Sequence, residues 1–364
     1  MKLTCNRQEL TQALSNVQRA VSSKSSIPAL EGILLRTDGS MLIICGYDLE
    51  IGMTTGIEAS CSETGSVVLN ARLFADIIRR LPEDSVLIMS DEKNVTTIVS
   101  GQSQFSIPGI PAEEYPELPV VTDTVSISLP HNILKSMIRQ TIFAVAETDT
   151  NPVHTGTMFE ISDQTIRLIS VDGFRLAVRS EPISCTEEMK FVIPGKTLSE
   201  ISKLLRDDDE DVSLKVSRRH ILFEIGDYIV LSRLLEGDFL DYRAAIPKTS
   251  ATEVVLQTRA FMDSVERVSL LINDRRRIPV RCIFENQEVK VSCETEIGRA
   301  NDQFPAEISG EGVEMGFNNR YLLDALRNSE DDEVKIQLNG PISPMTILPK
   351  EGDAFLFLVL PVRL

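Results

Sequence analysis

The sequence predicts an α+β protein built from three repeated domains, each with two helices and several mostly antiparallel strands. Two observations support this fold class: a helix-turn-strand pattern returns every 124 residues, and an amphipathic helix that precedes it returns with nearly the same spacing. Composition is the third, because 42% hydrophobic and 25% charged residues among 364 are typical of a globular chain with a sizeable core. At about 100–200 residues per domain, the length suits two or three domains.

The repeat is clearest in three segments that begin at Arg72, Lys196 and Arg320. Each reads basic, three residues, acidic, two residues, basic, with apolar residues between, which is typical of an amphipathic helix. An acidic turn and a β-like run follow each segment at the same offset. The predicted helices lie within 70–80, 194–206 and 318–328, and the predicted strands are 86–89, 212–216 and 334–338.

A second helix begins each repeat. Its apolar positions in the first two copies lie 124 residues apart, namely Leu10, Ala13, Leu14, Val17 and Val21 against Leu134, Met137, Ile138, Thr141 and Val145. The third copy keeps an apolar stripe at Phe261, Val265, Val268 and Ile272, with its register slipped by a few residues. These stripes predict helices within 6–24, 130–146 and 258–277. Alternating runs predict the strands 32–36, 41–45, 158–161, 166–170, 282–285 and 289–292.

Domain boundaries are expected where prolines and acidic residues interrupt the pattern, at 111–119 and near 246–250. We therefore divide the chain into residues 1–122, 123–250 and 251–364. Repeats of about 120 residues are too long for a solenoid, so each domain is expected to have its own hydrophobic core.

Charge is distributed unevenly along the chain. The formal net charge is −17, which as a bulk property opposes binding to nucleic acid or to an anionic membrane. The six helical windows nevertheless hold 18 Lys and Arg against 7 Asp and Glu, a net +11, so the other residues carry −28. On each repeated helix the two basic residues and the acidic one share a face. For a single helix this is typical of a solvated face with an intrahelical salt bridge, but three copies favour a positive helical surface with a function.

A positive helical surface suits contacts with DNA phosphates that carry no base specificity. Apart from Tyr321, no aromatic residue interleaves with the basic ones, whereas a platform that stacks single-stranded bases would need several. Duplex DNA is therefore favoured over a single strand.

Residues that would indicate catalysis or a metal are missing from the expected spacings. The histidines His131, His154 and His220 do not form a zinc motif, and Gly195-Lys196-Thr197 lacks the first glycine of a phosphate loop. The consecutive carboxylates of 207–211 cannot all converge on one ion, so a solvated turn is favoured there. We expect no enzyme activity, no metal and no cofactor.

The cellular setting is also suggested by missing features. The N-terminus has no apolar signal sequence, and the longest apolar run, 355–360, is far shorter than the roughly 20 residues of a membrane span. The six cysteines show neither CxxC spacing nor the density of a disulfide scaffold. We expect a cytoplasmic protein with reduced thiols and no membrane contact.

Five segments together resemble one known family over the whole chain. They are Met1-Lys2-Leu3-Thr4, Asn70-Ala71-Arg72-Leu73-Phe74-Ala75-Asp76, Val171-Asp172-Gly173-Phe174-Arg175-Leu176-Ala177, Asp238-Phe239-Leu240-Asp241-Tyr242-Arg243 and Leu360-Pro361-Val362-Arg363-Leu364. The sequence resembles the bacterial β sliding clamps, the processivity subunit of DNA polymerase III. That resemblance implies a DNA clamp fold and a head-to-tail homodimer, closed into a ring whose helices line a channel for double-stranded DNA.

The resemblance and the repeat together predict three groups of site residues. The DNA-binding group comprises Lys24, Arg72, Arg79, Lys196, Lys203, Arg320, Arg327, Thr148, Pro152 and Val153. The resemblance places a pocket for partner peptides at His154, Val171, Gly173, Phe174, Arg175, Leu176, Leu240, Ala244, Ala245, Ile342, Pro344, Leu360, Val362 and Arg363. It places the dimer interface at Phe105 and Ile107 against Leu270 and Leu271.

Some residues differ from those common in the family. Phe174, Leu240 and Ala244 stand where members often have His, Pro and Arg, so the peptide preference is expected to differ. Gln102 and Gln104 replace arginines, which weakens the usual charge pairing with Glu294 and Glu296.

The resemblance also implies partners. They are the DNA polymerase III catalytic subunit, an ATP-driven clamp loader, and other polymerases and repair proteins that carry short linear motifs. Two other classes stay open from the residues alone. One is a protein-only scaffold whose basic helices pack on acidic partners, and the other is a metal-dependent enzyme using the acidic turn at 207–211.

Overall fold

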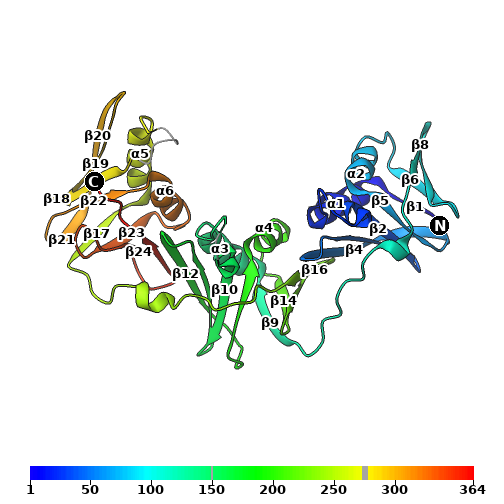
Figure 1. Ribbon diagram of the computed structural model, residues 1–364, viewed down its shortest axis with the longest axis horizontal. Helices are drawn as coiled ribbons and strands as arrows, with labels where there is room; N and C mark the ends of the chain where they lie inside the picture. Colours follow the sequence, from blue (N-terminus) through cyan, green and yellow to red (C-terminus); the bar gives the residue numbers. More distant parts are fainter. Residues whose placement is uncertain (149–150, 273–277) are drawn as a thin grey trace. The chain divides into compact units, whose positions relative to one another are not determined.

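The computed structural model describes residues 1–148, 151–272 and 278–364. The chain divides into two compact units, residues 1–132 with 200–234 and residues 133–199 with 235–364. Among the described residues, the first unit contains one β-sheet and the second contains two, and no sheet is shared between them (Figure 1). No helix in the described ranges is long and apolar enough to cross a membrane.

Each of the six predicted helical windows contains one α-helix. They are α1 (Arg7–Val17), α2 (Ala71–Arg79), α3 (His131–Ile142), α4 (Gly195–Leu204), α5 (Thr258–Ser269) and α6 (Asn319–Arg327). Helices α1 and α3 begin 124 residues apart, as do α2, α4 and α6 in turn. Helix α5 begins 127 residues after α3, so the slipped register of the third copy is confirmed. The end of that window, 273–277, lies outside the described residues.

The observed helices are shorter than the predicted helical windows, so their net positive charge is smaller than the predicted +11. Within the six observed helices 11 Lys and Arg stand against 6 Asp and Glu, a net +5. The remainder of the predicted +11 comes from flanking residues. Arg19, Lys24, Arg80 and Arg206 follow helix ends, and the segment 273–277 holds three arginines and one aspartate. The basic character therefore belongs to the helices together with the segments that follow them.

Local polar contacts explain where several helices begin. Asn6, Asn70 and Asn318 are N-cap residues, and their side-chain oxygens accept hydrogen bonds from backbone N–H groups of the first turn at 2.8, 3.0 and 2.9 Å. Such caps satisfy donors that have no partner inside the helix. Asn70 and Asn318 precede the first and third copies of the repeated basic helix, whereas the second copy has Pro194 at the equivalent position.

Five short 3₁₀ helices join these elements in the described ranges. They are η1 (Gln18–Ala20), η2 (Pro28–Glu31), η3 (Ala112–Glu114), η4 (Pro152–Thr155) and η5 (Tyr242–Ala245).

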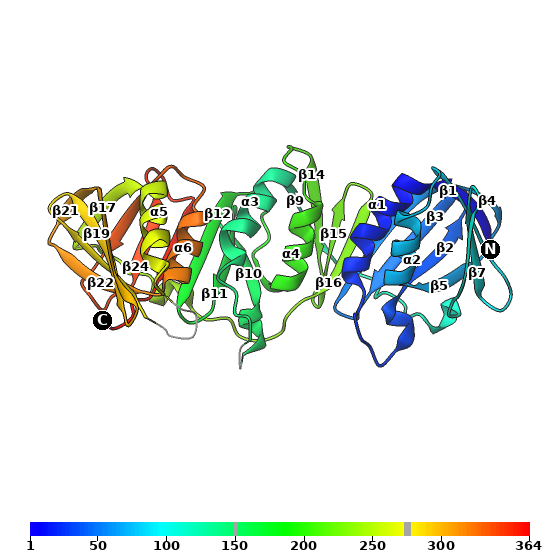
Figure 2. The ribbon, with the colours of Figure 1, turned by 90° about the horizontal axis from the view of Figure 1, so that it is seen from above.

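The first unit contains one antiparallel 12-stranded sheet. Its longest path runs β8-β7-β6-β1-β4-β16-β15-β14-β9, with β2, β3 and β5 attached through β4. The bounds are β1 (Lys2–Asn6), β2 (Gly32–Asp38), β3 (Met41–Tyr47), β4 (Ile51–Glu63), β5 (Ser66–Asn70), β6 (Ser85–Ser90), β7 (Val95–Ser100), β8 (Ser103–Pro108), β9 (Val125–Pro130), β14 (Asp211–Val216), β15 (His220–Ile225) and β16 (Tyr228–Arg233). Helices α1 and α2 lie side by side on one face of this sheet (Figure 2).

The second unit contains a nine-stranded sheet in the order β13-β10-β11-β12-β25-β24-β23-β17-β21 and a four-stranded sheet in the order β20-β19-β18-β22. The strands are β10 (Gly156–Ser162), β11 (Thr165–Val171), β12 (Arg175–Pro182), β13 (Met189–Pro194), β17 (Thr252–Gln257), β18 (Val280–Glu285), β19 (Glu288–Thr295), β20 (Gly298–Pro305), β21 (Glu307–Gly310), β22 (Val313–Phe317), β23 (Glu333–Leu338), β24 (Met345–Pro349) and β25 (Phe355–Val359). Helices α5 and α6 pack side by side, with α5 against the smaller sheet and α6 against β25.

Strands from successive repeats pair with each other inside each unit. In the first unit β4 pairs with β16, with Met53 opposite Val230, and in the second β12 pairs with β25, with Ala177 opposite Phe357. The nine strand runs that the sequence predicts all fall in observed strands, but these pairings between repeats were not predicted. They give each unit a continuous sheet to carry its helices.

The predicted apolar stripes form the core. Leu10, Ala13, Leu14 and Val17 of α1 are at most 2% exposed, and Phe261, Val265 and Val268 of α5 are at most 1% exposed. Fully burying one such large side chain contributes about 1.5–3 kcal/mol. The periodicity of the sequence therefore identified the helix faces that pack on the sheets.

Candidate functional site

The predicted DNA-binding residues of the first unit are all exposed. Arg72 and Arg79 lie on α2, Lys203 lies near the end of α4, and Lys24 lies between η1 and η2. Arg79 donates a hydrogen bond to Asp76 at 3.1 Å, and Lys203 donates one to Glu200 at 2.8 Å. These are the intrahelical salt bridges of a solvated face. Arg72 lies one helical turn before Asp76 on the same face of α2.

In the third copy of the pattern, on α6 in the second unit, two of the charged residues pair with residues outside their own helix. Arg327 donates to Glu266 of α5 at 2.7 Å, and Asp324 accepts from Arg175 at 2.6 Å instead of from its own helix. Lys196 and Arg320, at the first basic position of α4 and α6, are exposed. An exposed ion pair contributes only about 0–1 kcal/mol, so a phosphate can replace the carboxylate partner at little cost.

The loop near η4 contains the other three predicted DNA contacts. Thr148 and Pro152 are exposed. The side chain of Val153 is 0% exposed and belongs to a hydrophobic cluster with Met158, Val192 and others. Because it is enclosed by this core, we withdraw Val153 from the DNA-binding group.

The predicted peptide pocket corresponds to a group of exposed apolar residues in the second unit. Phe174, Leu240, Leu360 and Val362 are 54, 48, 36 and 39% exposed, and Ile342 is 87% exposed. We call these five residues the docking surface. Exposed apolar side chains are candidates for contact with other proteins when they lie together on a surface.

Four segments contribute to the docking surface. The β11–β12 turn carries Phe174, the segment before η5 carries Leu240, the segment between β23 and β24 carries Ile342, and the tail after β25 carries Leu360 and Val362. The tail is fixed by its backbone, since the N–H of Leu360 donates to the carbonyl oxygen of Phe174 at 2.9 Å and that of Val362 donates to Gly316 at 2.8 Å.

The other residues of the predicted pocket range from buried to exposed. Val171 and Leu176 pack in one hydrophobic cluster with Tyr242 of η5 and Leu358 of β25. His154 lies edge-on to Phe239, with ring centroids 5.7 Å apart. Pro344 directly precedes Met345, which pairs with Val359 one residue before Leu360. Gly173, Ala244, Ala245 and Arg363 are exposed.

The β11–β12 turn has a defined geometry. One carboxylate oxygen of Asp172 accepts hydrogen bonds from the backbone N–H groups of Phe174 and Arg175 at 2.9 and 3.0 Å. Gly173 has φ +85°, a left-handed conformation that glycine adopts without the steric cost of a Cβ. The turn therefore presents Phe174 outward in a fixed position.

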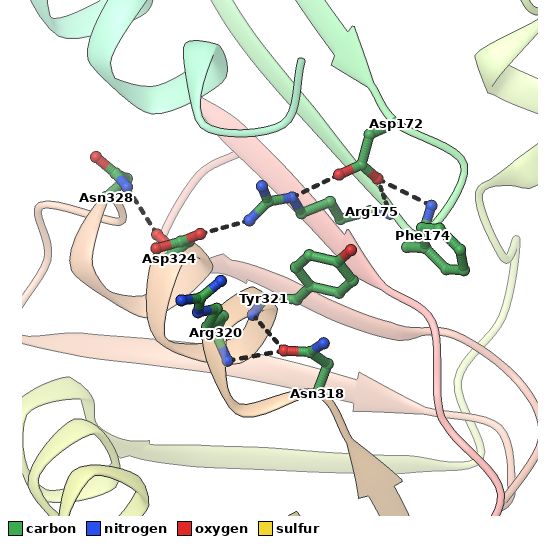
Figure 3. A network of polar contacts seen from close by, with 8 residues as sticks. All are labelled: Asp172, Phe174, Arg175, Asn318, Arg320, Tyr321, Asp324 and Asn328. Atoms are coloured by element: carbon green, nitrogen blue, oxygen red, sulfur yellow. Dashed lines mark hydrogen bonds and ion pairs between the residues drawn. The ribbon is translucent and has the colours of Figure 1, made fainter. Parts of the chain in front are cut away.

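Arg175 links this turn to α6 (Figure 3). Its Nε donates to Asp172 at 2.9 Å, and its Nη1 donates to Asp324 at 2.6 Å. The guanidinium lies over the ring of Tyr321, 4.5 Å from the centroid, and Tyr321 stacks on Phe174 with centroids 5.8 Å apart. A planar guanidinium can bridge two carboxylates and stack on an aromatic ring together, which a lysine ammonium cannot do.

Tyr321, Asp172 and Asp324 were not predicted as part of this site. The sequence assigned Tyr321 and Asp324 to the charged face of the repeated helix. One signal was available: Tyr321 is the single aromatic residue in three copies of that helix's basic segment, apart from the buried Phe74.

Glu160 of β10 is buried and binds two residues of η5 through its carboxylate. Its carboxylate accepts hydrogen bonds from Tyr242 at 2.8 Å and from Arg243 at 2.5 and 3.2 Å, and it pairs with Lys190 at 2.8 Å. Burial raises the pKa of Glu160, but the hydrogen bonds from Arg243, Lys190 and Tyr242 outweigh burial and lower that pKa to about 2. The side chain is thus an ionised anchor under the segment that carries Ala244 and Ala245.

The predicted interface residues lie on β8 and directly after α5. Phe105 is 40% exposed on β8, an outer strand of its sheet, whereas Ile107 on the same strand is 8% exposed. Leu270, directly after α5, is 83% exposed, and Leu271 is partly buried. Glu294 pairs within the chain with Arg299 at 2.6 Å. Ile107 therefore contributes mainly to its own core, while Phe105 and Leu270 are available for contact.

Three copies of a two-helix domain with antiparallel sheets and a basic residue exposed at the same helical position define a DNA clamp fold. Three family models of the DNA polymerase III beta subunit match this chain. The model of the N-terminal domain matches residues 1–119, that of the central domain 128–241 and that of the C-terminal domain 243–363. The chain belongs to the DNA polymerase III beta subunit family, the β sliding clamps.

Individual relatives agree with this assignment over the full length. The beta sliding clamp of Halalkalibacterium halodurans is 34% identical, with all of both chains covered. The crystal structure of the DNA polymerase sliding clamp from Bacillus subtilis superposes with a TM-score of 0.97 at 32% identity, covering 100% of this chain and 99% of that one. A sliding clamp from Pseudomonas aeruginosa bound to griselimycin gives a TM-score of 0.95 at 26% identity, with complete coverage of both.

Proposed function

We propose that two copies of this chain assemble head to tail into a closed ring around double-stranded DNA. The observation that carries this proposal is the exposed basic residue at the second position of α2, α4 and α6, because a repeated charge on a repeated element suits a repeating phosphate backbone. The clamp domains are assigned to 1–122, 123–250 and 251–364. In such a heterologous two-chain ring, six similar domains follow one another in a circle.

Contacts of this kind hold DNA without reading its sequence. Arg72, Lys196 and Arg320 are the principal phosphate contacts, with Lys24 and the second basic residues Arg79, Lys203 and Arg327 beside them. Thr148 and Pro152 approach the backbone from their loop. Encirclement makes tight binding unnecessary, so a chain of net charge −17 can stay on DNA while weak, salt-sensitive contacts let it slide.

Ring closure needs two complementary faces, one on each unit of the chain. In the first unit β8 is an outer strand with Phe105 exposed, and in the second unit β20 is an outer strand, with Leu270 exposed after the helix that packs on it. Outer strands expose unpaired backbone groups that another chain can pair with. We assign Phe105, Leu270 and Leu271 to the homodimer interface, with Ile107 supporting it from the core side.

The docking surface is the proposed attachment point for other proteins. A short segment with apolar anchors can seat on Phe174, Leu240, Leu360 and Val362, while Arg175 and the backbone supply polar contacts. The proposed users are the DNA polymerase III catalytic subunit, the clamp loader, and other polymerases and repair proteins. The protein tethers these partners in the cytoplasm and is not itself an enzyme.

Primer extension by the replicative polymerase on a primed circle, with the clamp loader and ATP, tests this function. We expect the wild-type protein to lengthen the products strongly, and deletion of Leu360 to Leu364 to abolish the effect while the dimer persists in sedimentation. Products of unchanged length with wild-type protein would contradict the proposal. A protein-only scaffold would leave product length unaffected.

A further inference from the structure

The acidic turns of the repeat each bind the start of a neighbouring helix through the backbone. The N–H of Arg7 donates to Asp84, that of His131 to Glu210 and that of Thr258 to Asp332, all at 2.7–2.8 Å. In the first copy the side chains also pair, with Arg7 Nη2 3.1 Å from Asp84. The second copy places a histidine where the first has an arginine, so the side-chain chemistry of this junction differs.

His131 is buried against that turn. Its side chain is 1% exposed, and its Nδ1 lies 2.9 Å from Oδ1 of Asp208. Neither ring nitrogen has a hydrogen-bond partner among the described residues, because the short contact to Asp208 is not aligned as a hydrogen bond. A buried polar atom without a partner costs about 1–3 kcal/mol, so an unpartnered imidazole needs an explanation.

Glu210 completes a group of three. One ligand atom each from His131, Asp208 and Glu210 lie within 4.8 Å of one another. Metal–nitrogen and metal–oxygen bonds of about 2.0–2.2 Å place neighbouring ligand atoms about 3.0–3.5 Å apart. Small side-chain rotations therefore bring all three atoms to one ion.

We propose that His131, Asp208 and Glu210 form a binding site for a divalent transition-metal ion, with Zn²⁺ as the probe that defines it. Imidazole nitrogen with two carboxylates is a donor set that suits Zn²⁺ and Co²⁺, while Ca²⁺ and Mg²⁺ prefer oxygen ligands alone. Water fills the remaining coordination position, since Glu210 is exposed. The expectation that 207–211 binds no metal rested on consecutive carboxylates, whereas the site uses alternate residues of the turn and a histidine 77 positions earlier.

The backbone around the site is already fixed. The N–H of Asn132 donates to the carbonyl oxygen of Asp208 at 3.1 Å, and its side chain donates to Asp209 at 2.7 Å. Arg206 is the competing cation, with Nη1 3.9 Å from Asp208 and 3.7 Å from Glu210. These contacts are longer than hydrogen bonds and the arginine is 60% exposed, so the ion can displace it.

Metal binding is measured on the full-length protein after treatment with a chelator and removal of that chelator. Titration with ZnCl₂ by calorimetry gives stoichiometry and affinity, and the visible absorption of bound Co²⁺ reports its geometry. The test variants are Asp208→Asn and Glu210→Gln, which keep side-chain size at partly exposed or exposed positions. Matched controls are Asp84→Asn, in the equivalent turn without a histidine, and His220→Gln, which removes another imidazole.

We expect this site to bind one Zn²⁺ per chain. The absorption spectrum of bound Co²⁺ should indicate an ion of low coordination number. Since loss of even an outer partner weakens metal sites 10–100-fold, each test variant should lose about 100-fold in affinity, while both controls bind like wild type. Zn²⁺ should also raise the thermal midpoint of the wild type but not that of Glu210→Gln. Three results would overturn the site: absence of binding at about 100 μM Zn²⁺, equal affinity in the test variants, or equal loss in the controls. His131 and Asp208 would then form only a polar contact that fixes the start of α3.

Discussion

Replacing Glu160 by glutamine removes the charge that anchors η5. The carboxylate is about 2% exposed, and hydrogen bonds bring its pKa from the ordinary 4.5 to about 2. At 1.36 kcal/mol per pKa unit, ionised Glu160 contributes about 3 kcal/mol to the free energy of unfolding near neutral pH. For a unit of this size, we expect Glu160→Gln to lower its unfolding midpoint by about 6–12 °C.

The stabilisation by Glu160 should decrease as the pH falls. A lowered pKa means that the stabilisation is complete above the unfolded value near 4.5 and is lost as the pH falls toward 2. The difference between wild type and Glu160→Gln should therefore fall from about 3 kcal/mol at pH 7 to about 2 kcal/mol at pH 3.5. Differential scanning calorimetry at several pH values measures it.

The matched control is Glu224→Gln. Glu224 accepts a hydrogen bond from Lys215 at 2.6 Å, but both side chains are more than a third exposed. Its loss should cost less than about 1 kcal/mol. An effect of Glu160→Gln no larger than that of the control, or one that grows as the pH falls, would refute the reasoning.

Three other predictions concern the two proposed binding surfaces. Reversing Arg72, Lys196 and Arg320 to Glu should weaken loading onto DNA, most at low salt, while sedimentation still shows the dimer; unchanged loading would remove these residues from the channel. Arg175→Lys should weaken binding of a partner peptide about 10-fold in fluorescence anisotropy, since lysine cannot bridge Asp172 and Asp324 over Tyr321, and retention on DNA should not change. Gly173→Ala places a Cβ at φ +85° and should destabilise the chain by about 1 kcal/mol in denaturant unfolding; a neutral result would mean that the turn relaxes.

The repeat and the apolar stripes were readable from the sequence because they depend on local spacing. Helix positions follow from burial every three or four residues, and the basic residues at 72, 196 and 320 follow from a copied pattern. Helix ends were less predictable, since caps such as Asn318 and the 3₁₀ turn at 18–20 depend on single hydrogen bonds.

Locating the docking surface required both the family resemblance and the structure. Its contacts join residues far apart in sequence, as when Arg175 binds Asp324, and no spacing rule predicts such a pair. The same is true of Glu160 with Arg243 and of His131 with Asp208. Val153 was misassigned because a position carried over from a family gives no information about burial.

Retention on circular DNA tests encirclement most directly. The protein is loaded onto a nicked circular duplex by the clamp loader, separated from free protein by gel filtration, and measured before and after the DNA is cut once by a restriction enzyme. Encirclement predicts that the protein stays on the circle and slides off the linear molecule. Equal retention on both forms would contradict it and favour a protein that binds DNA only by surface contact.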